Sequence, residues 1–293
     1  MRATEVLKEA LPYIRRFYGK RFVVKISGGV VEEPARLADL AEQLALLHYV
    51  GMRILVVHGG GPQATRLSEA LGIESKFVQG RRITDEKMLD VAKMVFAGKI
   101  NTDILGALRR AGAKAVGLSG VDGDILHVQR RAPTRIVDHA SGTESEVDFG
   151  FVGDVKDVDA SLLVYLLEGG YVPVVSSLGA DPEGVVYNIN ADTVAAELAV
   201  AVRASKLIEL TNAPGVLLDG QLVSELDPAG ARRLIQTGKA TEGMIPKLEN
   251  AIRAVERGVE AVHILSGQED GTLLREVFTK KGIGTMLTAT LPA

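Results

Sequence analysis

Cysteine is absent from this chain of 293 residues, so disulfide bonds, thiolate metal sites and a cysteine nucleophile are excluded. Positive charge is not in excess either, because the formal net charge of −3 gives no support to nucleic-acid binding as the main role. No apolar run reaches the roughly 18 residues that a membrane span needs, and the opening MRATEVLKEALPYIRR lacks the continuous apolar core of a signal peptide. We therefore expect a soluble, cytoplasmic protein that binds neither nucleic acid nor a membrane.

Hydrophobic residues make up 46% of the chain, which is enough for a large core. Short β-branched runs alternate with segments of helical periodicity, and this alternation predicts an α/β fold with a mostly parallel sheet covered by helices on both faces. The expected strands are 22–27, 53–59, 114–120, 171–177, 206–212 and 261–267, and the expected helices are 1–18, 36–50, 62–71, 87–111, 159–169, 192–203, 228–237 and 245–258. The segment 122–158 has turn residues between short alternating runs, which predicts a β-hairpin insertion.

Two glycine clusters follow the first two expected strands. Ser27-Gly28-Gly29 comes after a strand that carries the lone Lys25, and His58-Gly59-Gly60-Gly61-Pro62 comes after the next strand. Carboxyl ends of parallel strands are where ligands bind in such sheets, and helix N-termini there attract anions. Neither cluster matches a P-loop or G-x-G-x-x-G, and turns of this kind favour glycine for structural reasons alone. His58 could be a catalytic base or a strand-end histidine bonded to the backbone.

Other polar residues occupy similar positions. Arg82 precedes a helix expected to begin near Thr84, although a surface arginine would look the same. Asn188 leads into a helix at Asp192, where an acid could simply favour the helix dipole. Lys247 lies in the first turn of a helix and opposes that dipole, so it is either solvated or paired with an anion.

Ten segments occur in a characteristic order: VKISGG, LVVHGGGPQ, GRRITDE, GKINTDI, VGLSGVDG, VDFGFVGDV, YNINADTVAAELA, LTNAPGVL, TEGMIPKLE and HILSG. From about residue 1 to 287 the chain resembles the N-acetylglutamate kinases of the amino-acid kinase family. The lysine strand alone would indicate only the superfamily, whereas GRRITD, NINAD and GMIPK with the N-terminal helix point to the acetylglutamate branch. One departure is Ser27, where members commonly have glycine.

The resemblance implies a three-layer αβα sandwich. Residues 1–20 would form an oligomerisation and regulatory helix, residues 21–203 a lobe for N-acetyl-L-glutamate, and residues 204–293 a lobe for ATP. The implied reaction transfers the γ-phosphoryl group of ATP to the side-chain carboxylate of N-acetyl-L-glutamate, in arginine biosynthesis. That carboxylate is already ionised, so the reaction needs positive charge and N–H donors rather than a general base. Mg²⁺ would arrive with ATP, and no protein ligands for a metal are expected.

The resemblance also implies roles for individual residues. The catalytic group comprises Lys25, Lys247, Asp192 and Gly28. The substrate contacts comprise Gly60, Gly61, Arg82 for the α-carboxylate and Asn188 for the amide region. The nucleotide contacts comprise Thr211, Asn212, Gly215, Gly243 and Met244. In the arginine-sensitive branch, the N-terminal helix builds a hexamer, a trimer of dimers, and L-arginine inhibits at positions matching Lys206, His263, Glu276, Gly284 and Tyr18.

Three alternatives stay open from the sequence. The chain could phosphorylate a related carboxylate such as a carrier-linked aminoadipate, although that relative typically lacks the N-terminal helix. It could be a more distant aspartate or uridylate kinase. It could also be a catalytically silent amino-acid sensor, against which the presence of both lysines and Asp192 argues.

Overall fold

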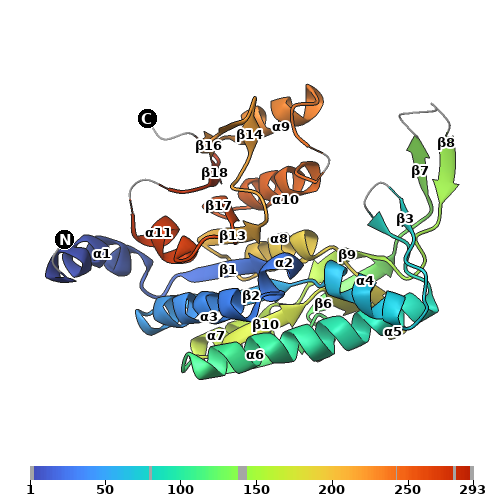
Figure 1. Cartoon of the computed structure of the whole chain (residues 1–293), viewed down its shortest axis with the longest axis horizontal. Coiled ribbons are helices and arrows are strands. Elements are labelled where there is room, and N and C mark those ends of the chain that lie inside the picture. Colours follow the sequence, from blue (N-terminus) through green and yellow to red (C-terminus); the bar gives the residue numbers. More distant parts are fainter. Residues whose placement is uncertain (1–2, 79–80, 138–143, 242, 280–281, 291–293) are drawn as a thin grey trace.

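The computed structural model describes residues 3–78, 81–137, 144–241, 243–279 and 282–290. Its centre is an eight-stranded sheet in the order β16-β18-β17-β13-β1-β2-β10-β5 (Figure 1). In that order the strands are Glu225–Leu226, Thr285–Thr288, Ala261–Ser266, Lys206–Thr211, Arg21–Ile26, Arg53–His58, Val172–Ser176 and Ala115–Ser119. The neighbouring strands of this sheet pair in parallel except β17 with β18, which confirms the mostly parallel sheet.

Helices cover both faces of this sheet and complete a three-layer αβα arrangement, with α3 and α6 on one side and α8 and α10 on the other (Figure 1). The first layer contains α3 (Pro34–Tyr49), α6 (Asn101–Arg110) and α11 (Thr272–Phe278), and the second contains α7 (Ser161–Glu168), α8 (Ala191–Ala201) and α10 (Ile245–Glu256). Successive strand residues point to opposite faces. Val24 of β1 therefore joins the first core and Val23 joins the second, which explains why the strands are apolar throughout.

The segment 122–158 contains the expected hairpin insertion. β6 (Leu126–Arg130) pairs antiparallel with β9 (Gly153–Val158), and β7 (Thr134–Val137) pairs with β8 (Glu144–Val147). Residues 138–143 lie outside the described part. β6 and β9 join β11 (Leu178–Ala180) and β12 (Val186–Asn188) in a second sheet. Figure 1 shows β7 and β8 projecting beside β3 (Phe77–Val78), which pairs with β4 (Arg81–Arg82).

The helix expected over 87–111 is divided into three parts. α5 (Glu86–Lys93) and α6 are separated by a π-helical stretch, Met94–Ile100. The residue pattern does not reveal this wider turn, which coincides with the place where Phe96 and Ile100 pack on the backbone of Gly60. The helix expected to begin near Thr84 is confirmed, because Asp85 caps α5 by accepting a hydrogen bond from the backbone N–H of Met88 at 2.8 Å.

The N-terminal helix is α1 (Ala3–Phe17), and residues 1 and 2 of the expected helix lie outside the described part. It projects from the edge of the molecule close to α11 (Figure 1). Phe17 anchors it, since its buried ring packs edge-on against Phe22 with 5.2 Å between ring centroids. Leu11 and Tyr18, by contrast, are 42% and 72% exposed.

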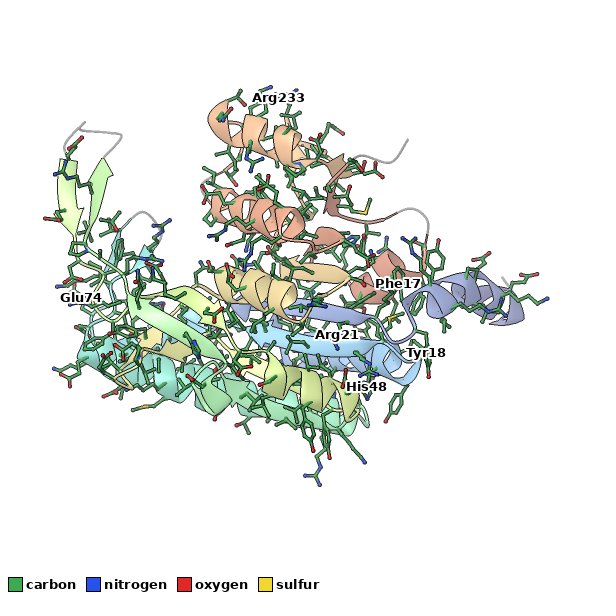
Figure 2. The ribbon with its side chains drawn as sticks, turned by 180° about the vertical axis from the view of Figure 1, so that it is seen from behind. Phe17, Tyr18, Arg21, His48, Glu74 and Arg233 are labelled. Atoms are coloured by element: carbon green, nitrogen blue, oxygen red, sulfur yellow. The ribbon has the colours of Figure 1, made fainter. Side chains whose placement is uncertain are left out.

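The expected boundary between the lobes at residue 204 does not interrupt the sheet. β13 follows that boundary and pairs in parallel with β1 from Lys206 to Leu210. The remaining elements are α2 (Gly28–Val31), α4 (Gly61–Ala70), the short 3-10 turn Asp122–Asp124, β14 (Leu217–Leu218), β15 (Gln221–Leu222) and α9 (Pro228–Gln236). Figure 2 shows that α9, which carries Arg233, and the segment around Glu74, which precedes β3, lie at different ends of the molecule.

Candidate active site

A cleft of about 1220 Å³ lies beyond the carboxyl ends of the central strands. The glycine turns after β1 and β2 line it, because α2 begins at Gly28 and α4 at Gly61. The first N–H groups of a helix have no acceptor within that helix, so both turns present donors to a ligand. Gly243 and Pro246, from the segment that begins α10, line the opposite wall. The cleft therefore lies between the two parts of the chain assigned to substrate and nucleotide.

Two lysines from distant parts of the chain share one carboxylate in this cleft. The ammonium nitrogen of Lys25, near the end of β1, lies 2.5 Å from Oδ1 of Asp192. The ammonium group of Lys247, in the first turn of α10, donates to Oδ2 of Asp192 at 2.7 Å. Asp192 lies in the first turn of α8, which Asn190 caps by accepting hydrogen bonds from the backbone N–H groups of Asp192 and Thr193. The helix thus begins at Ala191, one residue earlier than expected, and fixes the carboxylate between the lysines.

The electrostatics of this cluster keep it charged. Burial alone would raise the pKa of Asp192, but the adjacent ammonium groups of Lys25 and Lys247 outweigh it and hold that pKa well below its usual range. Burial lowers the pKa of Lys247, but the carboxylates of Asp192 and Glu209 more than compensate and raise it overall. The raised pKa keeps Lys247 protonated at neutral pH, so its ammonium group can stabilise negative charge on a bound anion.

Arg82 extends into the same cleft from β4. Its guanidinium group donates to the Oγ atom of Ser75 at 2.6 Å, and to the carbonyl of Gly61 and Oγ1 of Thr65 at 2.9 and 2.6 Å. The ring of Phe77 lies below it, 4.5 Å from its central carbon. Within the described residues no carboxylate pairs with it, and burial lowers its pKa. Such a held, uncompensated cation suits a ligand carboxylate.

Asn188 and the second glycine turn complete this wall of the cleft. Asn188, at the end of β12, donates to Oγ1 of Thr84 at 3.2 Å. A side chain at Gly60 would collide with Phe96 and Ile100, so only glycine allows this close packing.

His58 supports the second glycine turn and is not placed as a base. Its Nδ1 bonds the carbonyl of Gly59 at 2.9 Å, and its Nε2 receives a hydrogen bond from Asn101 at 3.2 Å. This pattern assigns the proton to Nδ1. Burial lowers the pKa of His58 to about 4, so the ring is neutral. The backbone-bonded alternative is the one that the structure supports.

The five residues expected at the nucleotide differ in position. Gly243 lines the cleft, whereas Met244 buries its side chain in the second core at the start of α10. The hydroxyl of Thr211 bonds the backbone of Ala213, and Asn212 accepts a hydrogen bond from Gln268 beside the turn that follows β1. Gly215 packs closely against Thr285 and Leu222, where a larger residue would not fit. Of the five candidates, Gly243 is therefore the one that lines the cleft.

Three of the five residues expected at an effector form a hydrogen-bonded chain on the opposite face of the sheet. The ammonium group of Lys206 lies 2.6 Å from Nε2 of His263, and Nδ1 of His263 lies 2.6 Å from Oε1 of Glu276. Burial lowers the pKa of His263, so a neutral ring can accept from the lysine and donate to the carboxylate. Burial lowers the pKa of Lys206 to about 8.

The other two effector candidates do not enter that chain. Gly284 packs on the backbone of Ile264, where a Cβ would lie 2.3 Å from the carbonyl oxygen. Tyr18 is exposed and lies against Gly51. Figure 2 labels Phe17 and Tyr18 at the end of α1, and the Lys206 ammonium lies 5.4 Å from the centre of the Phe17 ring. The chain of three residues is therefore adjacent to α1 through Phe17.

Sequence reasoning missed two buried residues beside the glycine turns and the lysines. Asn101 holds His58 and also donates to the carbonyls of Leu118 and Val174. Glu209 lies on β13 at the register position opposite Lys25. The only sequence signal for Glu209 was an acid between the apolar residues of the strand KLIELT.

No set of three or more His, Asp and Glu side chains in the described part is arranged to hold a metal ion. Among the described helices, none combines the length and the apolar character needed to cross a bilayer.

Comparisons with known proteins agree with this geometry. The sequence model of the amino acid kinase family matches residues 20–266. The acetylglutamate kinase of Methanocorpusculum labreanum is 46% identical over 288 residues, which cover 98% of this chain and 97% of that protein.

Two solved structures of the N-acetylglutamate synthase of Neisseria gonorrhoeae are also similar. One, complexed with coenzyme A and N-acetyl-glutamate, has a TM-score of 0.86 and 30% identity over 100% of this chain. The other, complexed with coenzyme A and L-arginine, has a TM-score of 0.83 and 28% identity over 99% of this chain. The chain spans only 65% and 66% of those longer chains. On the family match and the full-length relatives, the chain belongs to the amino-acid kinase family, among the proteins named acetylglutamate kinase.

Proposed function

We propose that this ATP-dependent kinase phosphorylates the side-chain carboxylate of N-acetyl-L-glutamate, giving N-acetyl-L-glutamyl 5-phosphate for arginine biosynthesis in the cytoplasm. The observation that carries the proposal is that Asp192, which lines the cleft together with Lys25 and the two glycine turns, holds the ammonium groups of both Lys25 and Lys247. The full-length likeness to acetylglutamate kinases supports this choice of substrate. The similar synthase structure that is complexed with N-acetyl-glutamate supports it as well.

The residues at the cleft suit phosphoryl transfer between two anions. The attacking carboxylate is ionised at neutral pH, so the barrier lies in bringing it to the γ-phosphoryl group and in stabilising the charge on the transferring oxygens. Lys25 approaches from β1 and Lys247 from α10, so the two cations can lie on different sides of that group. The backbone N–H groups of Gly28, Gly60 and Gly61 can donate to its oxygens. Asp192 positions both lysines and takes no proton.

We expect the two substrates to bind to different walls of the cleft, one in each proposed lobe. In the lobe 21–203, Arg82 would bind the α-carboxylate of the substrate and Asn188 its amide region. In the lobe 204–293, the nucleotide would lie along Gly243 and the start of α10, near the turn from Thr211 to Gly215. Because the acid of the cluster is already engaged by the lysines, Mg²⁺ would be held by the phosphate oxygens of ATP, whose charge it offsets.

A hydroxamate assay tests the substrate. Acyl phosphates react with hydroxylamine, so turnover with ATP and Mg²⁺ is compared for N-acetylglutamate, glutamate, aspartate and aminoadipate. We expect N-acetylglutamate to be strongly preferred. Preference for aminoadipate or aspartate would identify one of the related kinases instead. Binding of amino acids without turnover of any of the four would identify a sensor.

We further propose that L-arginine inhibits the enzyme and that α1 assembles it into a hexamer, a trimer of dimers. The buried chain from Lys206 through His263 to Glu276 supports an effector site, since Glu276 can accept from a cationic ligand. The position of Phe17 above Lys206 would couple that site to α1. The similar synthase structure that is complexed with L-arginine supports this choice of effector.

A further inference from the structure

Glu209 is a carboxyl group inside the central sheet that the proposed mechanism does not use. It lies on β13 with no exposed surface. Neither of its carboxylate oxygens has a hydrogen-bond partner among the described residues. Buried polar groups are nearly always paired, and an unpaired buried carboxylate is costly. The position of Glu209 therefore requires an explanation.

The surroundings of Glu209 connect it to the two catalytic lysines. On the sheet its register partners are Lys25 of β1 on one side and the apolar Ile264 of β17 on the other. Side chains at partner positions of neighbouring strands lie on the same face. That face is covered by α8 and α10, whose first turns carry Asp192 and Lys247. The charged groups that act on Glu209 are those three, Lys25, Asp192 and Lys247.

The charge of this cluster depends on whether Glu209 is ionised. Two ammonium groups and the carboxylate of Asp192 leave one net positive charge, and an ionised Glu209 cancels it. Phosphate oxygens entering the cleft would meet a neutral cluster in the ionised state and a cationic cluster in the protonated state. Buried charges interact strongly because little water screens them. The protonated state of Glu209 is therefore the one that favours an anionic ligand.

We propose that Glu209 is a proton-accepting positioning residue, which takes one proton from solvent when the nucleotide phosphates bind to Lys25 and Lys247. The proton adds to a carboxylate oxygen of Glu209 and no other bond changes. Once protonated, Glu209 no longer offsets the positive charge of the two ammonium groups. The inference rests on the proposed kinase function, because it names the anion as the phosphate chain of ATP.

The titration of Glu209 supports this role. Burial, and then the nearby Asp192 carboxylate, raise the pKa of Glu209 to about 7, against a smaller opposite effect of the two lysines. An added phosphate would raise it further for the same reason that Asp192 does. Asp192, which the lysines contact directly, keeps its charge at the same pH. The two carboxyl groups of this cluster therefore differ in behaviour: Asp192 stays ionised at neutral pH, whereas Glu209 gains or loses its proton in that range.

Calorimetry of nucleotide binding tests the proposal. The heat of binding the non-hydrolysable ATP analogue AMP-PNP with Mg²⁺ is measured above neutral pH in buffers with different ionisation enthalpies, which gives the protons taken up. We expect the wild-type protein to take up more protons than Glu209→Gln, whose side chain is permanently neutral. Glu197→Gln, which changes a carboxylate on α8 that pairs instead with Arg257, is the matched control and should behave as wild type.

The pH dependence of affinity gives a second readout that a merely structural role would not produce. Affinity of the wild type for AMP-PNP should fall as the pH rises above neutral, by up to about tenfold per pH unit. Glu209→Gln should match the wild type below neutral pH and keep that affinity above it. Proton uptake and pH profiles that are identical in the wild type and Glu209→Gln would overturn the proposal.

Two further measurements keep the test decisive. If Glu209→Gln does not fold, Glu209→Leu replaces it, and infrared difference spectroscopy of the wild type should show a new protonated carboxyl band on adding AMP-PNP. Absence of that band would overturn the proposal. Failure of the proposed function is distinguishable, since it would appear as no AMP-PNP binding or no acyl phosphate in the hydroxamate assay.

Discussion

Lys25 and Lys247 bind opposite oxygens of the same carboxylate, that of Asp192, at 2.5 and 2.7 Å. Lys25 comes from β1, in the middle of the central sheet, and Lys247 comes from the first turn of α10. Since Asp192 fixes both, the distance between the two cations depends on how α8 and α10 pack on the sheet.

We predict that Lys25→Ala and Lys247→Ala each lower turnover by at least about 100-fold, the scale for losing one charge-stabilising donor. The fold should survive, because each lysine lies at a strand or helix end. Hydroxamate formation measures turnover and circular dichroism checks the fold. Lys93→Ala, which removes an exposed partner of Asp90, is the control and should stay within experimental error of the wild type. Near-normal turnover in either cleft variant would contradict its assignment.

Arg82→Ala should separate substrate binding from nucleotide binding. Its guanidinium group is held by Ser75, Thr65 and the Gly61 carbonyl, with no described carboxylate to neutralise it. Losing a charge-assisted pair with the substrate costs about 1.5–3 kcal/mol, or roughly 10- to 150-fold in KM for N-acetylglutamate. The KM for ATP should change far less. Steady-state kinetics with each substrate varied in turn measure both constants, and an equal rise in the two would rule out this role.

The unfolding free energy should depend on pH through Glu209 in an unusual direction. Its pKa is raised from 4.5 to about 7 in the folded protein, so the folded state binds more protons than the unfolded chain between these values. Its contribution to stability is therefore complete below about pH 4.5 and is lost as the pH rises toward 7 and above. That loss is on the order of 3 kcal/mol.

Urea unfolding of the wild type and Glu209→Leu at about pH 5 and about pH 8 measures this effect. The wild type should lose more stability than the variant between the two values. Asp192 acts in the opposite sense, since its depressed pKa stabilises the fold above about pH 4 and that contribution is lost only in stronger acid. It therefore does not mask the comparison. Parallel curves for the two proteins would show that Glu209 does not titrate in this range.

Much of the fold could be predicted because apolar strands and helical periodicity are local signals. The parallel sheet, its helical layers and the hairpin insertion all follow from them. The π-helical turn at Met94–Ile100 could not be predicted, because it coincides with packing against Gly60 from a distant part of the chain. Secondary-structure propensity depends on residues that are close in the sequence, so it does not reflect a contact with a distant residue.

Some residues of the candidate site could likewise be predicted from the sequence, and others could not. Lys25 and Lys247 stood out because a lysine at a strand end, or in the first turn of a helix, needs an anion. Glu209 did not, since its meaning depends on the register that sets it opposite Lys25. Gly215 was predicted to contact the nucleotide because of its place in the LTNAPGV motif. The structure shows in addition that it packs closely against Leu222 and Thr285.

Inhibition by arginine should depend on α1. Deleting residues 1–15 should yield active dimers with greatly weakened inhibition, because the deletion removes the projecting part of α1 and leaves the core contact of Phe17 with Phe22. Glu276→Ala should also weaken inhibition without abolishing activity, since Glu276 lies on the face of the sheet opposite the catalytic cluster and bonds His263. Inhibition arises if arginine binds more tightly to a less active state of the assembly.

Sedimentation velocity and turnover at millimolar arginine measure both effects. Glu269→Ala is the control for Glu276→Ala, because it removes an exposed glutamate that pairs with Arg275 and lies outside the buried chain. It should leave inhibition unchanged. A full-length protein that sediments as a dimer, or one that keeps full activity at millimolar arginine, would refute the regulatory proposal. Because the cleft residues lie apart from Glu276, either result would leave the kinase assignment in place.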